Sequence, residues 1–189
     1  MATVLSVSAS PSATSRTARM LRTLDAALTA DGHTVTALDV RDLPPAALLS
    51  GDLGHPAIAR AVELFAAADG AVIGTPVYKA AYSGLLKCLF DLLPQYALAG
   101  KTVLPLATGG STAHVLAIDY ALRPVLSAMG AAHIVQGWFV LDRHIAVGDD
   151  GTVTLDPAAA GPLRQVVQQF STALDSQEAL RDRPAPALR

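Results

Sequence analysis

The sequence is poor in cysteine and in charge of one sign, and both shortages exclude whole classes of protein. Cys88 is the only cysteine, which rules out an intrachain disulfide and a cysteine-based metal site. Because it lies in an apolar run, we expect it to pack as a buried thiol. The chain has 14 lysines and arginines and 16 aspartates and glutamates, which gives a formal net charge of −2. No basic block offers a surface to nucleic acid.

Long apolar runs and targeting signals are missing as well. No stretch approaches the ~18 apolar residues that a membrane span needs. The N-terminus has no basic segment followed by an apolar one, as a signal peptide would have. We therefore expect a cytoplasmic protein. Aromatic residues make up only 5% of the chain, so any aromatic side chain that falls in a loop is informative.

The chain is instead rich in short apolar runs that alternate with helical patterns. It has 189 residues, of which 51% are hydrophobic and 16% charged. The apolar runs that predict strands are 3–7, 34–38, 70–74, 102–107 and 133–140. The periodic segments that predict helices are 15–30, 57–68, 83–93, 112–129 and 157–174.

Strands that are apolar on both faces and alternate with helices indicate a parallel sheet covered on each side. Right-handed crossovers then favour a doubly wound, five-stranded parallel sheet with helices on both faces, of the α/β class. We expect one domain over residues 1–175 and a disordered tail over 176–189, which is rich in proline and charge.

Two prolines interrupt this pattern. Pro105 lies inside the fourth predicted strand, where it removes a hydrogen-bond donor, so we expect a bulge or irregular pairing there. Pro124 lies inside the predicted helix 112–129 and cannot bond back to the carbonyl of Tyr120. Its ring also crowds that carbonyl, which predicts a kink or a π-bulge near Asp119 and Tyr120.

The first candidate ligand loop follows the first predicted strand and is lined by hydroxyls. In a doubly wound sheet this loop lies where ligands bind, against the positive end of the next helix. It has neither the glycines of a dinucleotide fingerprint nor a Walker loop, so it suits a terminal monophosphate such as that of FMN. The alternative is a serine-rich helix cap. The residues that we expect to hold the phosphate are Ser8, Ser10, Ser15, Arg16 and Thr17.

A second loop follows the third predicted strand. A turn at Pro76 exposes backbone groups that can bond the polar edge of a flavin ring, and Tyr78 and Tyr82 offer flat apolar surfaces. Packing of both tyrosines at a helix cap is an equally good interpretation. The candidate flavin contacts here are Pro76, Val77, Tyr78, Lys79, Tyr82 and Ser83.

A third loop follows the fourth predicted strand and contains paired glycines. Such glycines let the backbone approach a ligand closely, ahead of a helix N-terminus. The candidate flavin contacts here are Thr108, Gly109, Gly110, Ser111 and His114. Because all three loops follow parallel strands, they lie at the same edge of the sheet and outline one site with subsites for phosphate, ribityl chain and ring. We see no Ser-His-Asp constellation or metal cluster that competes with it.

These motifs resemble the NAD(P)H:FMN reductases of bacterial alkanesulfonate utilisation. The residues that carry the resemblance are Ser10-Pro11 with Ser15-Arg16, 75–84 (TPVYKAAYSG), 104–110 (LPLATGG), His114 and 119–126 (DYALRPVL). The resemblance implies a flavodoxin-like fold and reduction of FMN by NADPH or NADH. It also implies transfer of reduced FMN to a partner flavin-dependent monooxygenase that removes sulfite from sulfonates.

The resemblance further implies a homo-oligomer, tetramer or dimer, and a π-helix whose tyrosine matches Tyr120, with a role in flavin release or assembly. One residue departs from the family pattern, since Ser12 stands where a basic residue is common. This departure leaves open whether FMN is a substrate or a bound prosthetic group. Two alternatives stay open on the same fold: an FMN-bound NAD(P)H:quinone or azo reductase, and a flavodoxin-like electron carrier.

Overall fold

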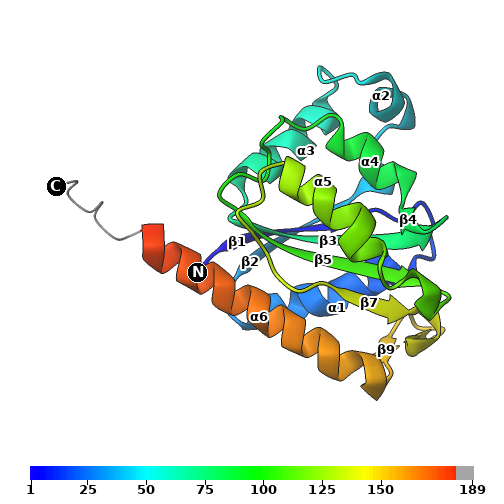
Figure 1. The fold of residues 1–189 in the computed structure, drawn as a ribbon. Coiled ribbons are helices and arrows are strands. Elements are labelled where there is room, and N and C mark those ends of the chain that lie inside the picture. Colours follow the sequence, from blue (N-terminus) through cyan, green and yellow to red (C-terminus); the bar gives the residue numbers. More distant parts are fainter. Residues whose placement is uncertain (182–189) are drawn as a thin grey trace.

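A twisted sheet forms the middle layer of the computed structural model, which describes residues 1–181 (Figure 1). The strands follow the order β2-β1-β3-β5-β6, while β7 also pairs with β5 and β4 pairs with β3. All of these pairings are parallel except that of β4. The strands are β1 (Thr3–Ser8), β2 (Thr34–Asp39), β3 (Gly70–Tyr78), β4 (Ala81–Tyr82), β5 (Thr102–Gly109), β6 (His133–Ile134) and β7 (Trp138–Leu141).

The sheet confirms the predicted α/β class but has seven strands, where we expected five. One added strand is β4, a two-residue strand that turns back on β3. The other arises because the predicted strand 133–140 is broken in two around Gly137. Both pieces pair with β5, so the doubly wound order of the sheet is unchanged.

The break in the last strand lies opposite Pro105, as we predicted for that proline. Val103 of β5 pairs with Ile134, and Leu106 pairs with Trp138, so the outer strand has one more residue than β5 over this stretch. A Cβ atom at Gly137 would lie 2.5 Å from the carbonyl oxygen of Pro105. The extra residue therefore bulges outward, and only glycine lets the two backbones approach this closely.

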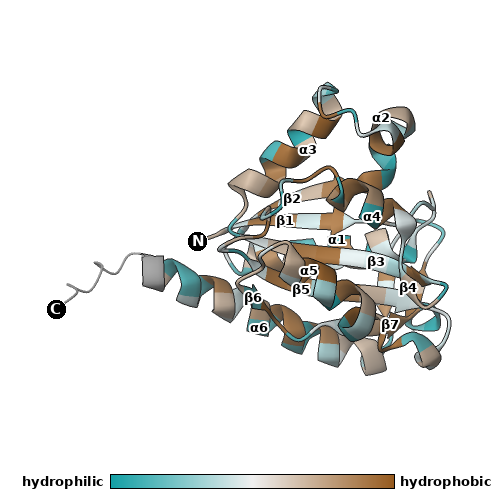
Figure 2. Cartoon of the chain, turned by 45° about the horizontal axis from the view of Figure 1, so that its top comes forward, coloured by the Kyte–Doolittle hydropathy of each residue, from teal (hydrophilic) through white to brown (hydrophobic). Residues whose placement is uncertain are grey.

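Helices cover both faces of the sheet. Figure 1 shows α3, α4 and α5 on one face and α1 and α6 on the other. The apolar side chains of each set pack against the sheet as a separate core, and α3 and α6 alternate apolar with polar stretches in Figure 2. The helices are α1 (Arg16–Ala30), α2 (Pro45–Ser50), α3 (Pro56–Ala67), α4 (Gly84–Phe90), α5 (Arg123–Ala128) and α6 (Pro157–Arg181).

The predicted helix 112–129 contains the π-turn that Pro124 led us to expect. It begins as a 3-10 turn, η2 (Thr112–His114), continues as a π-helix, η3 (Ile118–Leu122), and ends as α5. The π-turn accommodates the missing N–H and the ring of Pro124 next to Tyr120. The prediction of a π-bulge is confirmed, whereas the single continuous helix is wrong.

The C-terminal part differs more from our expectations. A hairpin of β8 (Ile145–Val147) and β9 (Val153–Leu155) precedes α6 and was not predicted. The helix α6 has 25 residues and continues through the first part of the predicted tail 176–189, to Arg181. Positions 182–189 of that tail lie outside the described residues. Within residues 1–181, no helix is both long and apolar enough to cross a bilayer.

Gln177 explains why α6 extends so far. Its side-chain amide donates to the carbonyl oxygen of Gly100 at 2.7 Å, and its carbonyl accepts from the Thr102 hydroxyl at 2.7 Å. Thr102 is the first residue of β5, and Gly100 lies two residues before it. These long-range contacts anchor the end of the helix to the sheet, and the local composition of the tail does not reveal them.

Candidate functional site

The three predicted loops converge on one cavity of about 380 Å³. This volume falls within the roughly 300–1,000 Å³ that small-molecule sites occupy. The cavity lies at the carboxyl ends of β1, β3 and β5, where ligands bind in doubly wound sheets. The residues that line it are Ser10, Ser12, Thr14, Ser15, Arg16, Thr17, Pro76, Val77, Tyr78, Thr108, Gly109, Gly110 and Asp142.

The first turn of α1 provides the part of the cavity best suited to an anion. Ser15 caps the helix, and its hydroxyl oxygen accepts from the N–H of Ala18 at 3.0 Å. The Ser15 hydroxyl can still donate its own hydrogen. The N–H groups of Arg16 and Thr17 precede the first intrahelical bonds and lie at the positive end of the helix. The helix-cap interpretation and the phosphate-loop interpretation are therefore compatible.

Hydroxyls within the same loop hold its shape. The N–H of Ser12 donates to the hydroxyl of Ser10 at 3.3 Å, and the Ser12 and Thr14 hydroxyls lie 3.2 Å apart. Ser12 and Thr14 line the cavity but were absent from our predicted set. They continue the run of hydroxyls in the sequence, and that run was the signal that could have identified them.

A buried hydrogen bond joins the first loop to the third. The hydroxyls of Thr17 and Thr108 lie 2.6 Å apart across the floor of the site. One of the two hydrogens is consumed by this bond, so the pair offers one hydroxyl hydrogen to a ligand instead of two. The bond also fixes the positive end of α1 beside β5.

The second loop is tied to the first by Ser83. Its hydroxyl donates to the carbonyl oxygen of Ala9 at 2.6 Å and accepts from the N–H of Leu86, which makes it the N-cap of α4. Its own N–H donates to the hydroxyl of Thr75 at 2.9 Å. Ser83 was predicted to contact the flavin, yet it lies outside the cavity lining and connects the loops that form the cavity.

The two-residue turn between β3 and β4 is strained. Lys79 and Ala80 have φ angles of +51° and +64°, a region that residues other than glycine and asparagine rarely occupy. Tyr78, at the end of β3, lines the cavity and is half exposed. Lys79 and Tyr82 do not line it, and Tyr82 packs against the core beneath the loop instead.

The paired glycines of the third loop differ in their surroundings. A Cβ atom at Gly109 would lie 3.0 Å from the ring of Phe139, so packing within the protein explains this glycine. A Cβ at Gly110 would meet nothing within 4 Å, and its φ is not in the left-handed region. Nothing among the described residues requires a glycine there, and its backbone is open to close approach from the cavity that it lines.

Three other predicted residues lie beside the cavity without lining it. Ser8 is buried within β1. Ser111 caps the η2 turn by accepting from the N–H of Ala113 at 3.2 Å. His114 ends the same turn and is half-buried. Asp142, in contrast, lines the cavity although we did not predict it. It follows β7, and no motif in the sequence marks it.

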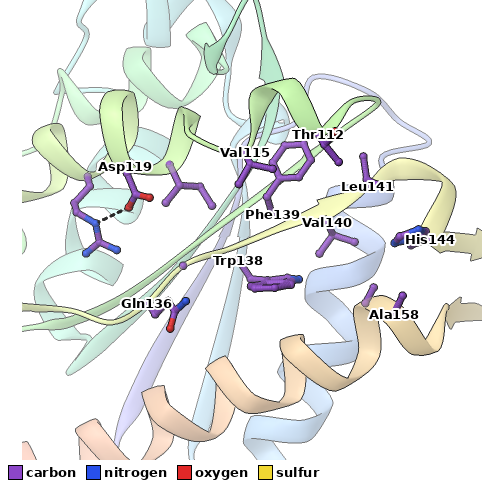
Figure 3. A pocket seen from close by; sticks show the side chains of 14 residues that line it. Thr112, Val115, Asp119, Gln136, Trp138, Phe139, Val140, Leu141, His144 and Ala158 are labelled. Atoms are coloured by element: carbon purple, nitrogen blue, oxygen red, sulfur yellow. Dashed lines mark hydrogen bonds and ion pairs between the residues drawn. The ribbon is translucent and has the colours of Figure 1, made fainter.

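A second cavity of about 360 Å³ lies between β7, the π-helix and the start of α6 (Figure 3). Arg123 lines this cavity, and its guanidinium group is already hydrogen-bonded within the protein. It donates to Asp119 at 3.1 Å, drawn as a dashed line in Figure 3, and to the carbonyl oxygens of Ile134 and Val135. Arg123 is the one arginine or lysine among the described residues that line this cavity, and it is already paired, so the cavity at the N-terminus of α1 is the better anion site.

Comparison with known proteins agrees with this geometry. The family model described as "NADPH-dependent FMN reductase" matches residues 2–145. The FMN reductase (NADPH) of Pseudomonas putida KT2440 is 45% identical over 188 residues, which cover 97% of this chain and 90% of the relative. The NADH-dependent FMN reductase SfnF of Pseudomonas putida is 36% identical, covering 75% and 80%. The apo crystal structure of an NADH:FMN oxidoreductase (EMOB) is 40% identical and covers both chains fully, with a TM-score of 0.86.

The strained turn beside the cavity yields a stability prediction. Replacing Ala80 by glycine removes the cost of its left-handed backbone, so Ala80→Gly raises the free energy of unfolding by about 1 kcal/mol. Urea denaturation measures the change. The control Ala81→Gly, in the extended strand β4, lowers the same quantity by about 0.5–1 kcal/mol. A loss of stability in Ala80→Gly would show that the turn is not strained.

Proposed function

This chain belongs to the NADPH-dependent FMN reductase family and is an oxidoreductase that uses FMN with NADPH or NADH; we propose that its FMN is an exchangeable substrate, handed in reduced form to a separate flavin-dependent monooxygenase. The observation that carries the proposal is the cavity at the N-terminus of α1, whose single cation is Arg16 among the described lining residues. Because the Arg16 guanidinium is exposed and solvent screens its charge, we expect it to bind a phosphate reversibly.

The residues of the first loop fit the phosphate of FMN. Arg16, the first turn of α1 and the hydroxyl-bearing residues Ser10, Ser12 and Ser15 all line the same cavity. Such a set matches the charge and the acceptor-rich shape of a phosphate monoester. In our proposal this loop binds and orients the phosphate, and Ser12 contributes a neutral hydrogen bond in place of a second cation.

The second and third loops fit the flavin ring. Val77 and Tyr78 give an apolar wall, and Gly109 and Gly110 give backbone close to the ligand. FMN, when bound, accepts a hydride from the nicotinamide, and this chemistry belongs to the two cofactors. The chain's own task is to fix the ring and leave one face open, which the half-exposed side chain of Tyr78 permits. We assign no acid or base to the protein.

We infer that the partner uses the reduced flavin to release sulfite from a sulfonate. The support is the sequence resemblance to reductases of alkanesulfonate utilisation, together with the similarity to SfnF. A reductase that releases its product needs a second enzyme to consume it, because the reduced flavin carries the electrons out of the site.

Dialysed protein tests both proposals. We expect little NADPH oxidation without added FMN and a rate that rises and saturates with it, since FMN is then a substrate. Adding an alkanesulfonate monooxygenase and its sulfonate should yield sulfite that depends on NADPH. Quinone reduction that ignores added FMN would favour the quinone-reductase alternative. Absence of oxidation of both NADPH and NADH would favour the electron carrier, and FMN reduction without sulfite would refute the sulfonate partner alone.

The surface around the π-helix supports a further proposal, a homo-oligomer. Val115, Leu116 and Tyr120 are exposed there, Tyr120 to 79%. Large apolar side chains grouped on a surface mark interfaces between chains. We propose that this surface joins copies of the chain in a dimer or tetramer, and that Tyr120 acts in assembly or flavin release.

Replacing Tyr120 by alanine tests this interface. We expect Tyr120→Ala to lower the molar mass measured by sedimentation equilibrium or to change the rate at which FMN leaves. Tyr96→Ala is the matched control, because Tyr96 is also exposed, at 63%, but lies beside Gly130, beyond the far end of α5. An unchanged molar mass together with an unchanged FMN off-rate would exclude the proposed role of Tyr120.

A further inference from the structure

Asp142 is the one acidic residue among the described residues that line the ligand cavity. It directly follows β7 and begins the short turn η4 (Asp142–His144). The last residue of β7, Leu141, pairs with Gly109 of β5. Asp142 therefore lies at the same sheet edge as the glycine loop and lines the cavity there.

The positive end of α1 lies close to the same point. The Thr17 side chain in its first turn bonds to Thr108 at 2.6 Å, and Thr108 pairs with Val140 of β7. Thr108, which is bonded to α1, is thus paired with Val140, and Asp142 follows Val140 by two residues. Both the phosphate-binding turn and the carboxylate flank the end of β5.

The two opposite charges of this cavity are not paired with each other or with another described residue. Within residues 1–181, the Asp142 carboxylate makes no side-chain hydrogen bond or ion pair, and neither does the Arg16 guanidinium. Elsewhere on the same molecule, nearby opposite charges do pair, as Arg22 does with Asp39 at 2.9 Å. Because Asp142 is half-buried in the lining, a bound anion meets its charge with less screening than at an open surface.

We propose that Asp142 lowers the affinity of the cavity for the phosphate of FMN and so keeps the flavin exchangeable. This inference rests on the proposed function and adds the residue that sets the affinity. A phosphate monoester carries about −1.5 to −2 charges at neutral pH, which the helix end and Arg16 attract and Asp142 repels. The opposition weakens binding of FMN but leaves a flavin without phosphate unaffected.

The opposite role is also chemically possible and gives the opposite result. A carboxylate can accept hydrogen bonds from ribityl hydroxyls or from a ring N–H. In that case its removal would weaken binding of FMN and of riboflavin alike. Comparing these two flavins therefore separates electrostatic repulsion from hydrogen bonding.

The test is flavin binding to Asp142→Asn, measured by quenching of flavin fluorescence in the absence of nicotinamide. The variant keeps the size of the side chain and removes its charge. We expect the Kd for FMN to fall roughly tenfold at low salt, and the gain to shrink near 1 M salt, where the Debye length is about 3 Å. The Kd for riboflavin should stay unchanged.

Two further variants make the result specific. Asp149→Asn removes the same charge from the exposed β8–β9 turn and should leave the Kd for FMN as it is. Asp142→Glu retains the charge and should keep binding weak. An unchanged or raised Kd for FMN in Asp142→Asn, or an equal gain for riboflavin, would overturn the inference. Oxidation of NADPH by the wild type tests the proposed function separately, so the two failures are distinguishable.

Discussion

The buried hydrogen bond between the Thr17 and Thr108 hydroxyls sets the geometry on which the site depends. It holds the first turn of α1 against the end of β5, at 2.6 Å between the two oxygens. The parallel order β1-β3-β5 brings the loops to one edge of the sheet, and this bond fixes the amides that suit a phosphate beside the glycines that suit a flavin ring. Ser83 adds a second tie, from the β3 loop to the carbonyl oxygen of Ala9. Two buried contacts thus hold in place three loops that the sheet has already made neighbours.

The cavity combines groups that favour binding of a phosphate with groups that weaken it. Arg16 and the positive end of α1 favour a phosphate, while Ser12 contributes no charge and Asp142 opposes it. The half-exposed Tyr78 leaves part of the site open to solvent. A reductase whose flavin must leave after reduction benefits from such a balance, because binding that is too tight would hold its product. The activity assigned to the family and the weak charge of the cavity are consistent in this respect.

Sequence reasoning succeeded where the cause is local and steric. Pro105 and Pro124 gave the bulge and the π-helix because a missing N–H and a rigid ring act on the nearest backbone. Prediction from the sequence failed where contacts with distant residues determine the structure. The length of α6 is one case, because Gln177 near its end bonds to Gly100. The β8–β9 hairpin had a visible signal, Asp150-Gly151 between two apolar runs, which we did not use.

At the site, the strand order brings the loops together and can be predicted from the sequence. Which residues line the cavity depends on tertiary packing: Asp142 lines it, whereas Ser83 does not.

Binding of the FMN phosphate at the N-terminus of α1 is tested most directly by the affinities of Arg16→Gln for FMN and riboflavin. We expect the Kd for FMN to rise about 10- to 100-fold, from loss of a charge-assisted hydrogen bond, and the Kd for riboflavin to stay unchanged. Arg19→Gln, which removes the same charge from α1 outside the cavity lining, should alter neither. An unchanged affinity of Arg16→Gln for FMN would contradict binding at this site and place the phosphate elsewhere.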